Sequence, residues 1–199
     1  MSAHRPTVLV AACLLSAVAL AAPAQSQDSC PNQIRSLVLP FLVGEHFHPS
    51  GWMGDPDDIH ADFYHKDCDR EGDDDGLCAA FTYRPSGSKR WAGIYWQHPD
   101  GNWGQEPDSP TTALVGQARR VTFWAKGETG TEKVEFKAGG LRTRIASLGR
   151  VELTDSWTQH VIALEDRNFS CLIGAFVWAI SADHNPRGAT FYLDEIRYE

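Results

Sequence analysis

Long apolar runs, clustered basic residues and helical repeats are all scarce in this chain of 199 residues. Beyond residue 24 no apolar run approaches the roughly 18–20 residues that a membrane-spanning helix needs, so we expect no span there. Lys and Arg together number 18 against 26 Asp and Glu, which gives a formal net charge of −8. Nucleic acids select for basic stripes, so this balance argues against such a partner. Apolar spacing of helical period never lasts beyond a turn or two, which argues against a helical fold.

The sequence also lacks the short motifs of common catalytic and metal sites. It contains no Gly-x-Ser-x-Gly elbow, no His-Glu-x-x-His motif and no phosphate-binding loop. No CxxC or CxxxC spacing occurs, which excludes the usual zinc clusters. The acidic stretch 67–76 lacks the alternating acids and closing Glu of an EF-hand loop, so a solvated loop is the favoured interpretation. His46 and His48 have no fixed third ligand, which favours polar loop histidines over a transition-metal site.

The N-terminal segment has the order of a secretory signal peptide. Arg5 precedes an apolar and small-residue run at 8–22, and the small residues at 22–24 suit cleavage. The run is too short for a spanning helix, and a lipoprotein-type cut before Cys13 would divide it. We therefore expect residues 1–24 to be a signal peptide and residues 25–199 to form one domain. The expected location is extracellular or periplasmic.

Four cysteines remain after such a leader is removed, and an even number in an oxidising compartment indicates disulfides. Cys68 and Cys78 bracket a short polar loop and are the natural local pair. Cys30 and Cys171 would then join the start of the mature chain to a late strand. Three pairings are possible for four thiols, so the spacing favours this arrangement without proving it.

Short β-rich runs, separated by turns rich in Gly, Pro, Asn and Asp, make up the rest of the chain. This rhythm predicts an all-β fold, a two-sheet antiparallel β-sandwich of the jelly-roll kind. The expected strands cover residues 37–43, 77–83, 91–97, 120–126, 133–138, 159–164, 172–181 and 190–198, with a weaker one at 150–153.

Aromatic residues gather on the expected strand 91–97 and in the loop after it. Sugar rings stack on indole and phenol faces and take hydrogen bonds from polar side chains at the rim. Period-two alternation places Trp91 and Tyr95 on one face, and Asn102 and Trp103 lie in the following loop. These residues form a candidate carbohydrate platform, although a core position is the competing interpretation for each ring. Four other large rings are expected in the core, namely Trp124, Trp157, Phe176 and Trp178.

The last expected strand carries an acid among apolar neighbours. Alternation puts Asp194 on one face with Tyr192, Ile196 and Tyr198. A carboxylate in such surroundings requires a metal ion, a cation or several N–H donors.

Several segments resemble, in their order and spacing, jelly-roll carbohydrate-binding modules of the galactose-binding-like β-sandwich superfamily. The likeness extends over most of residues 40–198, and no numbered family is assigned. VTFWAKG at 121–127 resembles their FWxKG strand, and FYLDEI at 191–196 resembles their closing strand. WTQHV at 157–161 matches the strand that usually lies between them. WAGIYW at 91–96, followed by NWG at 102–104, resembles secreted bacterial members.

The resemblance implies a two-sheet sandwich without catalytic activity and with a structural calcium ion. Carried onto this chain, the calcium ligands would be Asp194 and, from the first strand, Glu45. The expected function is the binding of a polysaccharide or cell-surface glycan by a monomer. Two alternatives are a glycosidase or lyase on the same fold, and an adhesion or structural domain without a glycan site.

Overall fold

The structure is a computed structural model, and it describes most of the chain after residue 32. The expected leader, Cys30 and Cys171 lie outside the described residues. Within the described part, no helix is long and apolar enough to cross a membrane. The described residues are 1, 33–66, 68–72, 76–104, 111–115, 118–141, 145–164 and 172–199.

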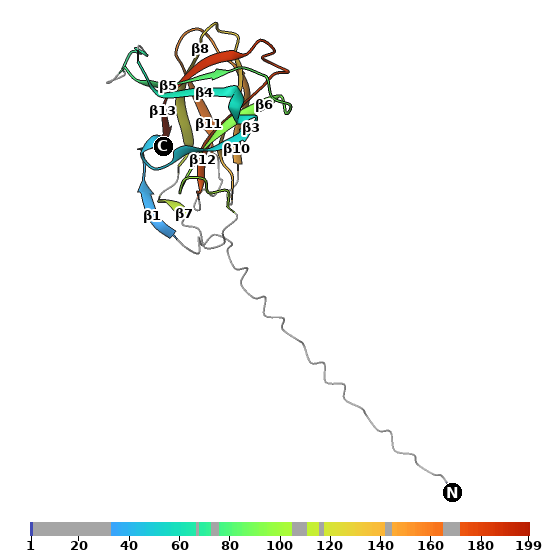
Figure 1. The fold of residues 1–199 in the computed structure, drawn as a ribbon. Coiled ribbons are helices and arrows are strands. Elements are labelled where there is room, and N and C mark those ends of the chain that lie inside the picture. Colours follow the sequence, from blue (N-terminus) through green and yellow to red (C-terminus); the bar gives the residue numbers. More distant parts are fainter. Residues whose placement is uncertain are drawn as a thin grey trace.

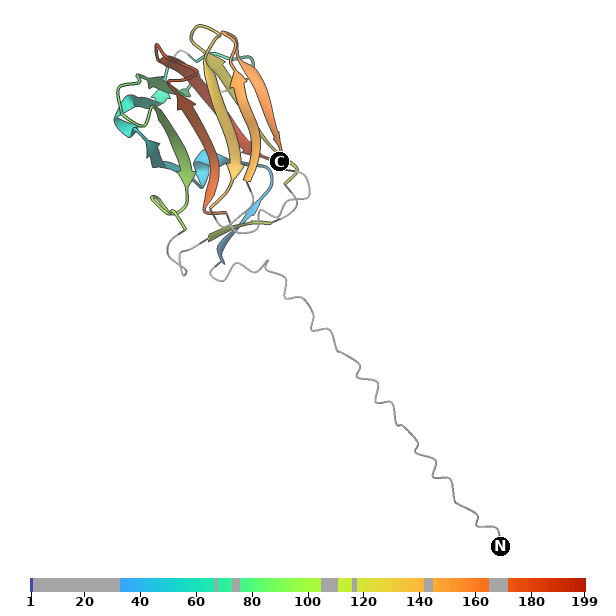
Figure 2. The same ribbon diagram turned by 90° about the vertical axis from the view of Figure 1, so that its right-hand side faces the viewer.

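Two large antiparallel sheets pack face to face (Figures 1 and 2). The five-stranded sheet has the order β10 (Ile145–Glu152), β9 (Lys133–Gly139), β12 (Gly174–Ser181), β6 (Trp91–Gln97) and β3 (His48–Gly54). The six-stranded sheet has the order β11 (Thr158–Ala163), β8 (Arg120–Gly127), β13 (Ala189–Tyr198), β5 (Cys78–Tyr83) and β4 (Ile59–His65), with β2 (Phe41–Leu42) paired to β13. A short parallel pair, β1 (Gln33–Val38) with β7 (Thr111–Val115), lies beyond one end of the sandwich (Figure 1). The expected two-sheet antiparallel β-sandwich is confirmed.

The core fills the space between the sheets and is rich in aromatic rings. The ring of Phe123 on β8 lies 4.7 Å from that of Phe136 on β9, and Phe81 on β5 lies 4.9 Å from Trp178 on β12. Phe176 is also fully buried, so the expected core positions of Phe176 and Trp178 are confirmed. Each such ring contributes roughly 2–3 kcal/mol by leaving water, which makes this aromatic layer the main force that holds the sheets together.

Most expected strands are present, and three unexpected ones complete the sheets. The expected strand 37–43 is divided, because Pro40 separates β1 from β2. β3 is an edge strand that includes a proline and two glycines, residues that are tolerated at edges but weaken a strand pattern. β4 alternates, with Ile59, Ala61 and Phe63 packed against the core and more exposed residues between them. β7 is the third.

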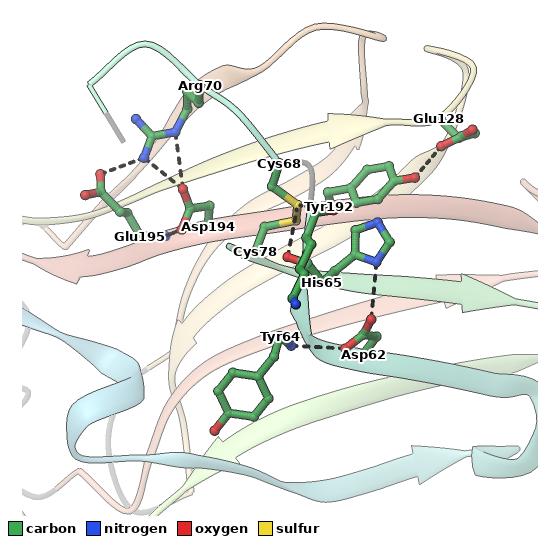
Figure 3. The surroundings of a disulfide bond; sticks show 11 residues. Asp62, Tyr64, His65, Cys68, Arg70, Cys78, Glu128, Tyr192, Asp194 and Glu195 are labelled. Carbon is green, nitrogen blue, oxygen red and sulfur yellow. Dashed lines mark hydrogen bonds and ion pairs between the residues drawn. A yellow bond between two sulfur atoms is a disulfide. The ribbon is translucent and has the colours of Figure 1, made fainter. Parts of the chain in front are cut away.

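A bulge in β13 changes which face its last residues occupy. Asp194 pairs with Trp124 and Arg197 pairs with Thr122, so β13 uses one more residue than β8 over this interval. Glu195 takes a left-handed φ of 44° within the bulge. Tyr198 is fully buried, whereas Asp194 lies on the outer side of the sheet with Tyr192 (Figure 3). The expectation that Asp194 and Tyr198 share a face is therefore wrong, because simple alternation does not allow for an inserted residue.

Candidate functional site

A groove follows the outer face of the five-stranded sheet, and strand pairing explains its shape. On β6 and β12, Gly93 lies opposite Ala179, with larger residues on either side. Ala179 lines the groove, and Gly93 lies beside it on the neighbouring strand. A Cβ at Gly93 would come within 2.5 Å of the backbone carbonyl oxygen of Trp178, so glycine is required for this close approach of two strands.

Two hollows adjoin in this groove. The first, of about 280 Å³, is lined on one side by Trp91, Tyr95 and Trp103. The second, of about 220 Å³, continues from Trp91 toward β9 and β10. Trp91, Glu135 and Ala179 line both hollows, which makes them parts of one groove. Three of the four residues of the expected platform thus meet in one place.

Trp91 presents the most accessible ring of the groove. The residue is 38 % exposed, against 5 % for Tyr95, and Trp103 is partly buried. The residue sits at the start of β6, where its backbone carbonyl oxygen accepts a hydrogen bond from the N–H of Asp55 at 2.9 Å. An indole that is anchored through its backbone and partly exposed is suited to stack on a flat apolar ligand surface.

Tyr95 forms the floor of the groove rather than an open platform. Its position on the outer face agrees with the alternation, but it is only 5 % exposed, and its hydroxyl donates a hydrogen bond to the carbonyl oxygen of Gly139. Burial raises the pKa of the Tyr95 phenol, so the hydroxyl stays protonated and remains a donor. Trp103, partly buried, packs edge-on against this ring at 6.3 Å and forms a wall above it.

Asn102 shapes the loop that carries Trp103. Its side-chain amide donates to the carbonyl oxygen of His98 at 3.2 Å, and its amide oxygen accepts from the N–H of Gly104 at 3.0 Å. Its backbone carbonyl oxygen also accepts from the side chain of Gln97 at 2.9 Å. Asn102 is 8 % exposed and does not line the groove, so its role here is to hold the loop in place.

Charged residues of β9 and β10 form the opposite side of the groove, and no sequence motif marks the basic ones among them. Lys137 lies 2.9 Å from Glu135, and Lys133 lies 3.2 Å from Glu152. Arg150 on β10 pairs in register with Glu135. Alternation with the buried residues of β9 marks these side chains as outward. Their place beside Trp91 follows from β9 pairing with β12, which local alternation cannot reveal.

The aromatic rings on the outer face of the other sheet are covered by the protein's own cations. The guanidinium of Arg70 lies 4.5 Å from the ring centre of Trp124. The Lys126 ammonium lies 5.5 Å from the ring of Trp157 and 4.9 Å from that of Tyr192. The expectation that Trp124 and Trp157 belong to the core is wrong, because both are half-buried on this outer face. Since Arg70 and Lys126 already lie over these ring faces, this sheet offers a poorer stacking surface for a ligand than Trp91 does.

The disulfide between Cys68 and Cys78 is confirmed, with the two Cα atoms 5.8 Å apart. It closes the loop that carries Arg70 over the six-stranded sheet (Figure 3). The second expected pair, Cys30 with Cys171, lies outside the described residues.

Arg70 also forms an ion pair with Asp194, the carboxylate at which calcium is expected. Its guanidinium lies 2.8 Å from Asp194 and 3.1 Å from Glu195, and the side chains of Arg70 and Asp194 are only 4 % and 13 % exposed (Figure 3). Glu45 lies in a single 3-10 turn, η1 (Val43–Glu45), with its side chain 59 % exposed and 3.9 Å from His46. Among the described residues no three His, Cys, Asp or Glu side chains form a metal-binding group.

These residues do not fit a calcium site. Calcium takes six to eight oxygen ligands, whereas Asp194 faces a guanidinium that would repel a divalent cation. The charge compensation that the closing strand requires comes from Arg70 instead. Calcium at Asp194 and Glu45 stays a prediction.

A larger hollow of about 500 Å³ opens between the edges of the two sheets. Phe47, Phe63 and Trp96 are among its apolar lining residues, and Asp194 and Glu195 lie at its rim. Both rim carboxylates are bound by Arg70, and the pocket holds no exposed indole. The exposed ring of this hollow is that of Tyr64, which is 79 % exposed, whereas the groove over the five-stranded sheet places an indole beside Lys133, Arg150 and Ser181, which can donate hydrogen bonds to a ligand.

No protein-family model and no curated protein matches the chain. Among solved structures, a family 30 carbohydrate-binding module aligns with a TM-score of 0.54 and 13 % identity, over 81 % of this chain and 98 % of that one. A family 61 module, TmCBM61 in complex with β-1,4-galactotriose, aligns at 0.46 and 16 % identity, over 77 % and 90 %. A CBM29-2 mutant of family 29 aligns at 0.45 and 10 % identity, over 80 % and 91 %. The likeness to the family 30 module confirms the carbohydrate-binding-module type of β-sandwich as the fold.

Proposed function

We propose that this chain is a secreted, non-catalytic module that binds a polysaccharide or cell-surface glycan in the groove of the five-stranded sheet. The ring of Trp91 carries the proposal, because it stands where two hollows meet and the residue is 38 % exposed. Sugar rings combine apolar C–H faces with hydroxyl rims, and the groove offers an indole face beside Glu, Lys, Arg and Ser side chains.

The carboxylates of the groove favour binding over hydrolysis. Glu135 is the only carboxylate among the described lining residues of the two hollows, and it is paired with Lys137. Glycosidases place two carboxyl groups about 5 Å or roughly 6.5–9.5 Å apart across the scissile bond. A single, paired carboxylate does not supply an acid and a base.

Secretion is supported by the disulfide as well as by the expected leader. Disulfides such as Cys68–Cys78 persist in oxidising compartments and are rare in the cytosol. A module that retains an extracellular polymer belongs in such a compartment.

Replacing Trp91 tests the binding site. We expect Trp91→Ala to weaken glycan binding by about 10- to 100-fold, since an indole face of this kind contributes roughly 1.5–3 kcal/mol. Affinity electrophoresis in gels that contain different polysaccharides identifies a bound polymer, and isothermal titration calorimetry then gives the affinity. For so small a contact, the wild-type Kd should lie between about 1 μM and 1 mM.

Trp52→Ala is the matched control. Trp52 on β3 is 39 % exposed, close to the value for Trp91, but it lines neither hollow. As a third variant, Ala179→Leu fills the bottom of the groove without removing any aromatic surface. Binding that is lost in the Trp52 variant, or kept in both groove variants, would contradict the proposed site.

Assays for new reducing ends on the same polymers test the enzymatic alternative. Turnover by the wild type that Glu135→Gln abolishes would overturn the non-catalytic assignment. Absence of retention on every polymer tested would instead leave the fold as an adhesion or structural domain.

A further inference from the structure

We infer that the groove selects an anionic glycan, one whose sugars carry a carboxylate or a sulfate ester, and that Arg150 binds this group. The inference rests on the proposed function, because it assigns the class of glycan to the same groove. It depends on a contrast between the charge of the whole chain and the charge of the groove.

The groove is basic in an acidic protein. The chain has a formal net charge of −8, yet the charged lining residues of the second hollow are Lys133, Arg150 and Glu135, and the first hollow adds Lys137. At physiological ionic strength, charges beyond about 8 Å are largely screened. A bound ligand therefore experiences the excess of cations in the groove more strongly than the negative charge elsewhere.

Arg150 is the cation that is available to a ligand. Lys133 and Lys137 each have a carboxylate partner, at 3.2 Å and 2.9 Å. The guanidinium of Arg150, on the exposed side of β10, has no ion pair or hydrogen bond with any other described residue. Its planar fork can donate two parallel hydrogen bonds to a carboxylate or a sulfate, a geometry that a lysine ammonium does not offer.

The pairing register connects Arg150 with the aromatic side of the groove. Arg150 lies opposite Glu135, Glu135 opposite Ala179, and Ala179 opposite Gly93. Trp91 is on the same strand and the same face as Gly93. With about 4.8 Å between neighbouring strands, the three steps from β10 to β6 span roughly 14 Å. A glycan that crosses the strands over the small central residues can stack one ring on Trp91 and place an anionic group at Arg150.

Glu135 lies between these two points, and its ion pair limits the repulsion. Lys137 compensates its charge at 2.9 Å, and both side chains are about one-third exposed. Exposed ion pairs such as Lys137–Glu135 and Lys133–Glu152 contribute no more than about 1 kcal/mol to stability. Both lysines can therefore also turn toward an anionic ligand.

Matched polymer pairs test the inference. The first pair is polygalacturonate and its fully methyl-esterified form, which share a backbone but differ in charge. The second is dextran sulfate and dextran. We expect the wild type to bind at least one anionic polymer about 10-fold or more tightly than its neutral partner. That preference should weaken as NaCl is raised from 50 to 500 mM.

Variants of Arg150 connect the preference to this residue. Arg150→Ala should bring the anionic polymer to the affinity of its neutral partner, whereas Arg150→Lys should keep part of the preference. Arg187→Ala removes one positive charge from an exposed loop outside the groove and should leave the preference unchanged. Circular dichroism and thermal melting confirm that each variant is folded.

The outcomes separate this inference from the proposed function. Equal binding of charged and neutral polymers, with retention still sensitive to Trp91→Ala, overturns the inference and leaves glycan binding intact. A preference that survives in Arg150→Ala also overturns it. Retention of no polymer contradicts both. A preference for polygalacturonate alone identifies a carboxylate as the recognised group, and a preference for dextran sulfate alone identifies a sulfate ester.

Discussion

Arg70 determines the chemistry of three neighbouring side chains. Its guanidinium lies over the ring of Trp124 and binds the carboxylates of Asp194 and Glu195 (Figure 3). With only 4 % of its side chain exposed, Arg70 is almost completely removed from water, and its binding partners must replace the lost hydration. The disulfide loop that holds Arg70 thereby also neutralises the half-buried acid of the closing strand.

Arg70→Met should destabilise the protein by about 3 kcal/mol, because it removes the cation that pairs with the largely buried carboxylate of Asp194. Chemical denaturation in urea measures the difference. The double variant Arg70→Met/Asp194→Asn should recover much of the loss, since it also removes the negative charge that the guanidinium compensates. Equal stability of the two variants would show that Asp194 gains nothing from Arg70.

Chelation of the wild type and of Asp194→Ala tests the calcium prediction. If Arg70 alone compensates Asp194, chelation with EDTA leaves the melting temperature of the wild type unchanged. A drop on chelation that Asp194→Ala abolishes would establish calcium at this carboxylate.

Asp58 ties the loop between β5 and β6 to the short turn that precedes β4. It ends η2 (Pro56–Asp58), and its carboxylate accepts hydrogen bonds from the Ser86 hydroxyl at 2.5 Å and from the N–H of Gly87 at 3.1 Å. β5 and β6 belong to different sheets, so this carboxylate holds a crossing between the layers. The Ser86 hydroxyl, helped by the backbone N–H groups of Ser86 and Gly87, lowers the pKa of Asp58 below 3.8 despite its burial.

Asp58→Asn should lower the free energy of unfolding by about 1–2 kcal/mol at pH 7, since it weakens charge-assisted hydrogen bonds. Because the folded-state pKa is depressed, the stabilisation is present above about pH 3.8 and is lost as the pH falls below that value. The two proteins should therefore converge in acid. Denaturation between pH 2.5 and 7 tests this, with the exposed neighbour Asp57→Asn as control; a constant difference across that range would contradict it.

The sequence predicted the strands of the site better than it predicted which strands pair with one another. Alternation correctly placed Trp91 and Tyr95 on one face of β6, because it depends only on the backbone of one strand. It could not show that Trp103 covers Tyr95, or that Arg150 and Lys133 stand across the groove, since these contacts depend on β9, β12 and β6 being neighbours. Trp124 was wrongly expected in the core because β8 carries large apolar residues on both faces, so alternation alone does not tell which face is buried.

At the scale of the whole molecule, the two sheets have outer faces that carry different features. The groove occupies the outer face of the five-stranded sheet. The disulfide loop with Arg70 covers part of the six-stranded sheet (Figure 3). The aromatic core lies between them. Changes on one outer face should therefore leave the other unaffected.

Cys68→Ser/Cys78→Ser tests this independence. Loss of a crosslink across a sequence separation of 10 should cost about 2–3 kcal/mol, because the unfolded chain regains conformational freedom. At 25 °C, where the variant remains folded, the affinity for a glycan in the groove should equal that of the wild type. A parallel fall in affinity, with an unchanged circular dichroism spectrum, would show that the two faces are coupled.

The adjacent small residues Ala179 and Gly93 have a consequence for how the protein can diversify. Ala179 is on the outer side of a strand whose inner side builds the core, so enlarging or shrinking it alters the depth of the groove without altering the packing between the sheets. Gly93 does not share this freedom, because a neighbouring carbonyl group excludes a side chain there. Homologous lineages can thus acquire new ligand preferences through single outward substitutions while they inherit the same interior.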